Sequence, residues 1–206
     1  MKTSFTPAPF PGNCTVKISM LYIVLLCFYS PVFSQSSLTF TPYVQGLNAP
    51  VEIRNAGDGS GRLFVVEQAG RIRIIRNGIL QPGNFLDINS ITGYDTFQGL
   101  WGVVFTQNYA RSKVFFVLYT GRNGNTELVR YQASRQNADS ADPASRAVLL
   151  SLDGSTSGGP HFGQMHFGRD GYLYLTLSDG SSPSRTTPFA QQGFNLYGKM
   201  LRLNVN

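Results

Sequence analysis

Short apolar runs separated by polar turns make up most of the chain after residue 48. Loops rich in Gly, Ser and Asn bound these runs, and no stretch of helical length carries an apolar spacing of 3.6 residues. The pattern therefore predicts an all-β protein. The candidate strands cover residues 51–54, 63–67, 71–76, 100–105, 114–120, 128–132, 148–152, 165–167, 173–177 and 200–205.

The clearest hairpin joins residues 63–67 to residues 71–76 through the turn Gln68-Ala69-Gly70. Basic and apolar residues alternate at the start of its second strand, and Asn77-Gly78 then predicts another tight turn. The longest polar segment, residues 133–145, is rich in Ser, Asn, Asp and Ala, and we expect it to be a surface loop.

A polar turn followed by an aliphatic-aromatic strand occurs at three places, where the strands start at Leu63, Val114 and Leu173. The intervals between these starts are 51 and 59 residues, and each interval holds about four candidate strands. Such a period is typical of the blades of a β-propeller, and a β-sandwich is the alternative.

The repeat accounts for about three blades, whereas propellers close with about 4 to 8. An open array would expose the apolar faces of its first and last blades to water. We therefore expect a missing C-terminal half or a second chain to complete the ring.

An almost unbroken apolar run covers residues 18–33, with Lys17 just before it. It is too short and too poorly flanked for a spanning helix, which needs about 20 apolar residues. The run predicts a signal peptide over residues 1–34 that is cleaved before Gln35, with an uncleaved membrane anchor as the alternative. Cleavage would leave a secreted or periplasmic protein without a membrane segment and without cysteine, because both cysteines lie in this leader.

The charge of the chain excludes one class of partner. The net charge is +6, and because Lys2 and Lys17 lie in the leader, the mature chain carries about +4. This excess is spread along the sequence, and no run of Lys and Arg is longer than two residues. Nucleic-acid binding needs a clustered basic stripe, so we expect no nucleic-acid partner.

Four motifs in order make the mature chain resemble the glucose/sorbosone dehydrogenase family, whose vertebrate relatives include the hedgehog-interacting proteins. They lie at residues 61–72, 98–105, 167–174 and 198–204. The resemblance implies that residues 35–206 are the N-terminal portion of a six-bladed propeller. It also implies an oxidoreductase that acts on a sugar, a polyol or a related alcohol with pyrroloquinoline quinone (PQQ), and calcium in the complete protein.

The resemblance also implies roles for three residues. His161 matches the family's general base, a task that suits histidine because its pKa lies near neutral pH. Gln98 and Asp179 match positions beside the cofactor. The alternatives are a loop histidine without chemistry and a turn-forming Asp before Gly. His166 alternates with apolar neighbours and is expected on the outer side of a strand. We predict no metal ligand, because the acidic residues show no metal-binding spacing.

Departures from the family pattern raise other functions. Phe97 stands where the family has Glu or Gln, and the segment after His161 is one residue shorter. The family's arginines that hold the quinone carboxylates, and most of its calcium ligands, fall beyond Asn206. We therefore expect this chain to be inactive alone. A non-catalytic extracellular propeller that binds a protein or a glycan, or a truncated product, are the alternatives.

Overall fold

The computed structural model describes residues 38–154, 162–180 and 189–205. Its strands all lie in the compact unit Pro42–Asn206. None of the helices in this described part is long and apolar enough to cross a membrane. The predicted signal peptide lies outside the described residues.

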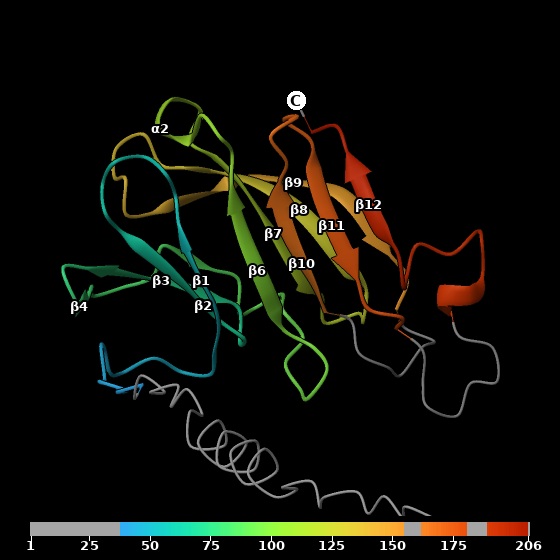
Figure 1. Ribbon diagram of the computed structural model, residues 1–206, viewed down its shortest axis with the longest axis horizontal. Coiled ribbons are helices and arrows are strands. Elements are labelled where there is room, and N and C mark those ends of the chain that lie inside the picture. Colours follow the sequence, from blue (N-terminus) through green and yellow to red (C-terminus); the bar gives the residue numbers. More distant parts are fainter. Residues whose placement is uncertain (1–37, 155–161, 181–188, 206) are drawn as a thin grey trace, which may run out of the picture. The chain divides into compact units, whose positions relative to one another are not determined.

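Three antiparallel sheets follow one another along the chain (Figure 1). The first runs in the order β1-β2-β3-β4, with β5 also paired to β3. The second is β6-β7-β8-β9 and the third is β10-β11-β12. The strand bounds are β1 Pro50–Asn55, β2 Leu63–Glu67, β3 Arg71–Arg76, β4 Ile79–Leu80, β5 Leu86–Asp87, β6 Leu100–Phe105, β7 Val114–Thr120, β8 Thr126–Ala133, β9 Ala141–Leu152, β10 Gly163–Phe167, β11 Leu173–Leu177 and β12 Met200–Leu203.

The sequence repeat corresponds to the sheets. Leu63, Val114 and Leu173 each begin the second strand of a sheet, β2, β7 and β11 respectively. Sheets formed from neighbouring strands and repeated in chain order are the blades of a propeller, and about three blades are present here. The prediction of an all-β propeller is therefore confirmed, and the β-sandwich alternative is not.

Side chains that alternate along the middle sheet fill two separate cores. On β7, Phe115, Val117 and Tyr119 pack toward the first sheet, with Phe64, Phe85 and Phe105 in the same cluster. Phe116 and Leu118 point the other way, toward Met165, Leu173 and Leu175 of the third sheet. Because successive side chains of a strand face opposite sides, the continuous apolar run of β7 buries both faces of the middle blade.

The polar segment at residues 133–145 is the main correction to the predicted strands. Only its first part is a loop, because β9 begins at Ala141 and pairs Asp142 with Gln132 of β8. The first half of this strand is largely exposed and polar and carries no apolar signal, whereas its second half contains the predicted strand at residues 148–152. The short strands β4 and β5 and the one-turn helix α2 (Tyr109–Ser112) were not predicted either. The turn at Asn77-Gly78 is confirmed, since both residues have positive φ, 53° and 75°.

Candidate functional site

The first strands of the three sheets begin at one common end. The Gln68 amide donates to the carbonyl of Ala49, just before β1, and the Leu100 amide that starts β6 donates to the Gln68 carbonyl. The ring of Trp101 on β6 meets Phe162, the residue before β10, with centroids 5.7 Å apart at 67°. We call this end, with Ala49, Gln98, Trp101, Phe162 and Asp179, the strand-start face.

Gln98 is half-buried in the connection that leads into β6. Its carbonyl accepts a hydrogen bond from Gln68 Nε2 at 2.9 Å. Its side-chain oxygen lies against Gly93, where an added Cβ would come within 2.4 Å of that oxygen. Glycine at position 93 therefore leaves room for the Gln98 amide, a group that can donate and accept hydrogen bonds.

Trp101 and Phe162 form an aromatic pair that sequence reasoning did not single out. Trp101 Nε1 donates to Thr120 Oγ1 at 3.4 Å, and Phe162 is 46% exposed. An indole beside a half-exposed phenyl ring offers an apolar surface on which a sugar ring or another flat molecule can pack. The signal was available, since Trp101 is the one tryptophan of the chain and lies inside the motif at residues 98–105.

Asp179 lies in the connection between β11 and β12, two residues beyond Leu177, which pairs with Gly163 at the start of β10. Its carboxylate accepts a hydrogen bond from the amide of Ala190. The amide of its neighbour Ser178 donates to the carbonyl of Phe162 at 2.9 Å. The carboxylate thus shapes this connection, and its role beside a cofactor stays a prediction.

Gln98 and Asp179 lie in connections at the strand-start face, and the site roles of Gln98, Asp179 and His161 all stay predictions. His161 lies outside the described residues. His166 is exposed on β10 while its neighbour Met165 is 1% exposed, as the alternation predicted. It lies within β10, three residues after the strand begins.

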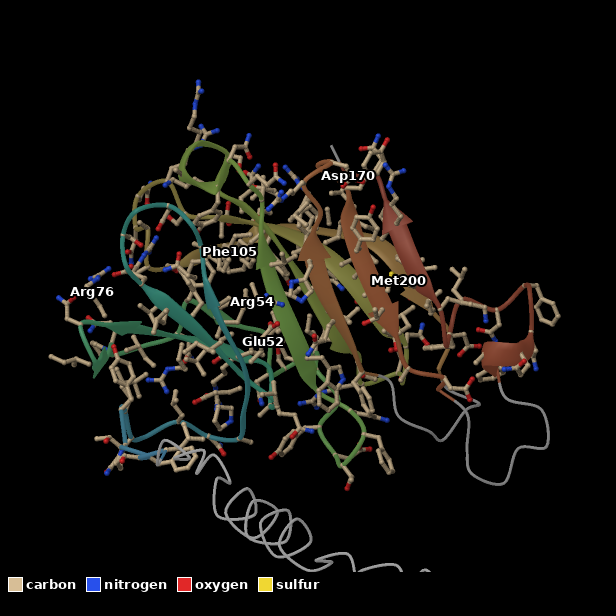
Figure 2. All side chains as sticks on the ribbon, in the orientation of Figure 1. Glu52, Arg54, Arg76, Phe105, Asp170 and Met200 are labelled. Carbon is tan, nitrogen blue, oxygen red and sulfur yellow. The ribbon has the colours of Figure 1, made fainter. Side chains whose placement is uncertain are left out.

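A charged group joins the three first strands and was also missed from the sequence. Glu52 and Arg54 lie on β1 beside β6 (Figure 2). Glu52 Oε1 pairs with Arg54 Nη2 at 2.7 Å, and Glu52 Oε2 accepts the Val103 amide of β6 at 2.8 Å. Arg54 Nη2 also donates to the carbonyl of Met165 on β10 at 3.0 Å. The spacing of Glu52 and Arg54 puts both on one face of a strand, but nothing local indicated their partners.

The described residues contain no group of three or more His, Cys, Asp or Glu side chains that could hold a metal ion. Lys199, in the same connection as Asp179, donates its amine to the carbonyls of Phe189, Ala190 and Tyr197 at 3.4, 2.8 and 3.3 Å. That amine is therefore committed to the backbone.

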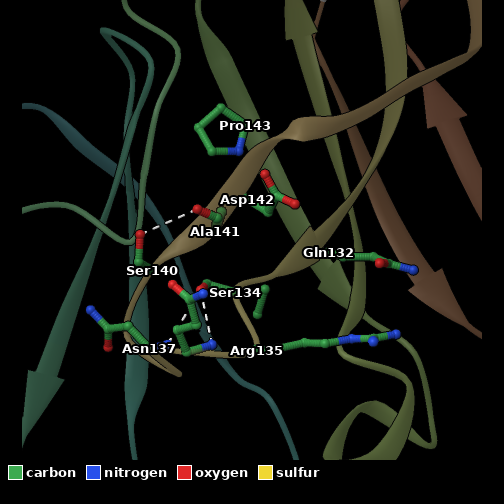
Figure 3. Close-up of a pocket in the computed structure, with 10 residues that line it drawn as sticks. Gln132, Ser134, Arg135, Asn137, Ser140, Ala141, Asp142 and Pro143 are labelled. Carbon is green, nitrogen blue, oxygen red and sulfur yellow. Dashed lines mark hydrogen bonds between the residues drawn. The ribbon is translucent and has the colours of Figure 1, made fainter.

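A polar hollow of about 590 Å³ lies away from this face, at the hairpin between β8 and β9 (Figure 3). The hairpin largely satisfies its own polar groups. Ser134 Oγ accepts the amides of Gln136 and Asn137, and Ser140 Oγ donates to the Ala141 carbonyl. A single hairpin supplies the whole lining of this hollow, whereas the strand-start face is built from residues of several strands and connections.

The family described as Glucose / Sorbosone dehydrogenase matches residues 47–206 of this chain. The hedgehog-interacting protein of Homo sapiens is 31% identical over 179 residues, which cover 79% of this chain and 25% of that protein. The HIPL2 protein of Arabidopsis thaliana is 29% identical, over 72% of this chain and 28% of its own length. The chain thus spans about a quarter of the length of these curated relatives.

Solved structures of sugar dehydrogenases share the fold. A glucose dehydrogenase described as a putative oxidoreductase, from Thermus thermophilus, superposes with a TM-score of 0.63 at 26% identity over 78% of this chain and 46% of that chain. The PQQ-bound aldose sugar dehydrogenase of Streptomyces coelicolor gives a TM-score of 0.62 at 18% identity over 79% and 46%. At that identity the second likeness concerns the fold alone.

Proposed function

This chain belongs to the glucose/sorbosone dehydrogenase family, and we propose that it is the N-terminal portion, residues 35–206, of a secreted propeller that oxidises a sugar or a related alcohol at the strand-start face. The observation that carries the proposal is the contact between Trp101 and Phe162 at the starts of β6 and β10, with Gln98 two residues before β6 and Asp179 in the connection after β11. Trp101 and Phe162 would pack against the sugar ring, and the Gln98 amide would hydrogen-bond a hydroxyl group.

PQQ is the cofactor that the family and a related structure suggest, and the described residues fit it only in part. The aromatic pair can stack on a quinone, and Gln98 can hydrogen-bond one. The quinone's carboxylates need cations with suitable geometry, such as arginines, but the amine of Lys199 is bound to three carbonyls. We therefore expect this chain to bind PQQ weakly unless further blades supply the cations.

His161 is the proposed general base that removes the proton of the substrate hydroxyl. The test is an assay of dye reduction by the complete secreted protein with sugar, PQQ and calcium. His161→Ala should lower the rate by about 10²- to 10⁴-fold. His166→Ala is the matched control, because His166 is the other histidine of the chain and lies within β10. An equal rate for His161→Ala and wild type would overturn the proposal.

A non-catalytic binding protein is the second candidate, and the exposed aromatic residues favour it. Tyr94 and Phe97, in the connection before β6, are 57% and 46% exposed, close to the 46% of Phe162. Exposed aromatic side chains of this kind are common anchors for protein or glycan partners. Phe97→Ser should then abolish capture of an extracellular protein or glycan. Tyr172→Ser should not, because Tyr172 lies in the turn between β10 and β11, at the opposite end of these strands. Sugar oxidation by the wild type together with unchanged binding by Phe97→Ser would exclude this candidate.

A further inference from the structure

A second hollow, of about 440 Å³, lies beside the connection between β5 and β6. The connection contributes Ser90 and Ile91, and the turn between β7 and β8 contributes Arg122 and Asn123. The remaining side chains come from the middle sheet: Tyr119 on β7, Glu127 on β8 and Arg146 on β9. Unlike the hairpin hollow, this one is lined by two separate parts of the chain, the β5–β6 connection and the middle sheet.

Arg146 is held in place by Glu127 and Tyr119, and its guanidinium also lies close to the Tyr131 hydroxyl. Its Nη2 lies 2.7 Å from Glu127 Oε2 and 2.9 Å from the Tyr119 hydroxyl. That hydroxyl donates to the same Glu127 oxygen at 2.5 Å. Tyr119 is 1% exposed and so provides a rigid base, while the side chain of Arg146 keeps 36% of its surface exposed. Arg146 therefore keeps accessible surface for a ligand while its buried neighbours hold it in place.

Arg122 has a fixed backbone and a lightly held side chain. Its amide donates to the Ile91 carbonyl at 3.1 Å, and the neighbouring Gly121 forms a β-bridge with Thr92. The guanidinium, by contrast, makes a long hydrogen bond of 3.3 Å to the carbonyl of Asn89. A ligand that offers a charged acceptor would compete well with that neutral carbonyl, because charge-assisted hydrogen bonds are shorter and stronger.

The charges around the hollow favour an anion. Arg122 and Arg146 face the single carboxylate of Glu127, so the lining carries an excess of one positive charge. Arginine matches the planar geometry of carboxylates and similar oxyanions. Asn123 adds a neutral amide, and Ser90 adds a hydroxyl group.

We propose that this hollow binds the oxyanion group of an acidic ligand, a carboxylate or a sulfate, between Arg122 and Arg146. The site lies beside the β5–β6 connection, whose far end carries Gln98 on the strand-start face. Its Gly121 and the Gln98 side chain both lie against Gly93, so the hollow is at the same end of the middle sheet as that face, but its lining residues are different ones. The proposal does not depend on the proposed sugar oxidation.

Titration of the full chain by calorimetry at constant ionic strength tests the proposal, with sodium glucuronate and sodium sulfate as probes and neutral glucose as the control. At least one anion should bind. Binding of glucuronate alone identifies a carboxylate site, and binding of sulfate alone identifies a sulfate site. If neither anion binds, the proposal is wrong, whereas heat from glucose reports the sugar site proposed at the strand-start face.

Variants separate a built site from general attraction to a basic protein. Arg122→Gln should weaken binding of the anion about ten- to hundredfold, because it removes charge-assisted hydrogen bonds. Arg135→Gln, which removes an exposed arginine from the hairpin hollow, should leave the affinity unchanged. Equal affinities for Arg122→Gln and wild type, or equal losses in both variants, would overturn the proposal. Arg146→Gln should also weaken binding, but if it fails to fold, Arg122→Gln decides.

Discussion

The guanidinium of Arg54 lies against the imidazole ring of His166, with Nη1 3.3 Å from Nδ1 and Nη2 3.2 Å from Nε2. The two residues are 112 positions apart in the chain and belong to β1 and β10, the first strands of the first and third sheets. Together with the bond from Arg54 to the Met165 carbonyl, the contact ties the outer two of the three blades across β6.

Arg54→Ala should therefore destabilise the fold although Arg54 is partly exposed. The change removes hydrogen bonds to Met165 and leaves Glu52, whose side chain is 13% exposed, without its cation. The expected loss is about 2 kcal/mol, seen as a fall of roughly 4–8 °C in the melting temperature. Arg135→Ala, at an exposed hairpin position, should stay within about 0.5 kcal/mol of wild type. Equal melting temperatures for the two variants would contradict the role of Arg54 between blades.

Arg62 should be far more sensitive to substitution than its neighbour Arg76. Arg62 is 3% exposed and pairs with Asp58 at 2.6 Å and Asp139 at 2.6 Å. Arg62→Met would leave the carboxylate of Asp58, 6% exposed, buried without its partner, at a cost of about 3–5 kcal/mol in urea unfolding. Arg76→Met removes a 40% exposed partner of the same Asp139 and should cost about 0–1 kcal/mol. Similar costs for both variants would show that the burial of Arg62 has no energetic consequence.

The same cluster should make stability fall in acid. Burial alone would raise the pKa of Asp58, but hydrogen bonds from Ser60 and Arg62 outweigh it and lower that pKa. Burial alone would likewise raise the pKa of Asp139, but hydrogen bonds from Arg62 and Arg76 outweigh it and lower that pKa. A lowered folded pKa adds stability above the unfolded value of about 3.9, and this stability is lost as the pH falls through the folded values. Urea unfolding between about pH 2 and 6 should show this slope, and Asp139→Asn should flatten it.

Tyr109→Phe should cost little or even stabilise the protein. The Tyr109 hydroxyl is buried among the described residues without a hydrogen bond of good geometry, although the charge of Arg62 lies nearby. A buried hydroxyl without a hydrogen bond costs free energy of desolvation on folding, and replacing Tyr with Phe removes that cost. Tyr197→Phe is the control, because the Tyr197 hydroxyl donates to Thr126 Oγ1 at 3.0 Å, and its loss should cost about 1 kcal/mol. A larger loss for Tyr109→Phe than for Tyr197→Phe would refute this assignment.

Burial also raises the pKa of Tyr109 to about 12. A raised folded pKa means that the stabilisation is complete below the unfolded value of about 10 and is lost as the pH rises toward the folded value. Tyr109→Phe should therefore remove part of the alkaline loss of stability between about pH 10 and 12.

Gly163 should resist substitution for a steric reason. It starts β10 with a backbone so close to β11 that an added Cβ would come within 2.0 Å of the Thr176 carbonyl oxygen. Gly163→Ala should cost about 1–3 kcal/mol and shift the neighbouring Phe162. An added Cβ at Gly193, in the connection between β11 and β12, meets nothing within 4 Å, so Gly193→Ala should be close to neutral. Unfolding curves and the fluorescence of Trp101, which contacts Phe162, report both effects.

Local pattern was sufficient for the strands that are buried on at least one face. The bounds of β2, β3, β6, β7 and β11 agree with the apolar runs, because burial of alternate side chains produces the signal that was read. The first half of β9 was not predicted because its residues are largely exposed and polar. The pairing of Asp142 with Gln132 holds it in the sheet. In β4 and β5, two residues are too few to form a pattern.

Some residues of the candidate site were predicted from the sequence, and others became evident only in the structure. Gln98 and Asp179 were predicted from motifs, and both lie in connections at the strand-start face, where their roles stay predictions. The pairing of Trp101 with Phe162 was not foreseen, since it joins residues of two different sheets. The role of His161 stays a prediction, because that residue lies outside the described part of the chain.

The sequence by itself determined the all-β class, the positions of most strands and the repeat that predicts blades, because these depend on the alternation of side chains over a few neighbouring residues. Only the tertiary structure decided which polar groups meet. Whole strands or turns must come together before Arg54 contacts His166, before Arg62 pairs with Asp139, and before Arg122 and Arg146 line one hollow. The charge of a residue does not encode its distance from a residue in another blade or strand. The packing of the apolar faces of the sheets sets the positions of these polar side chains.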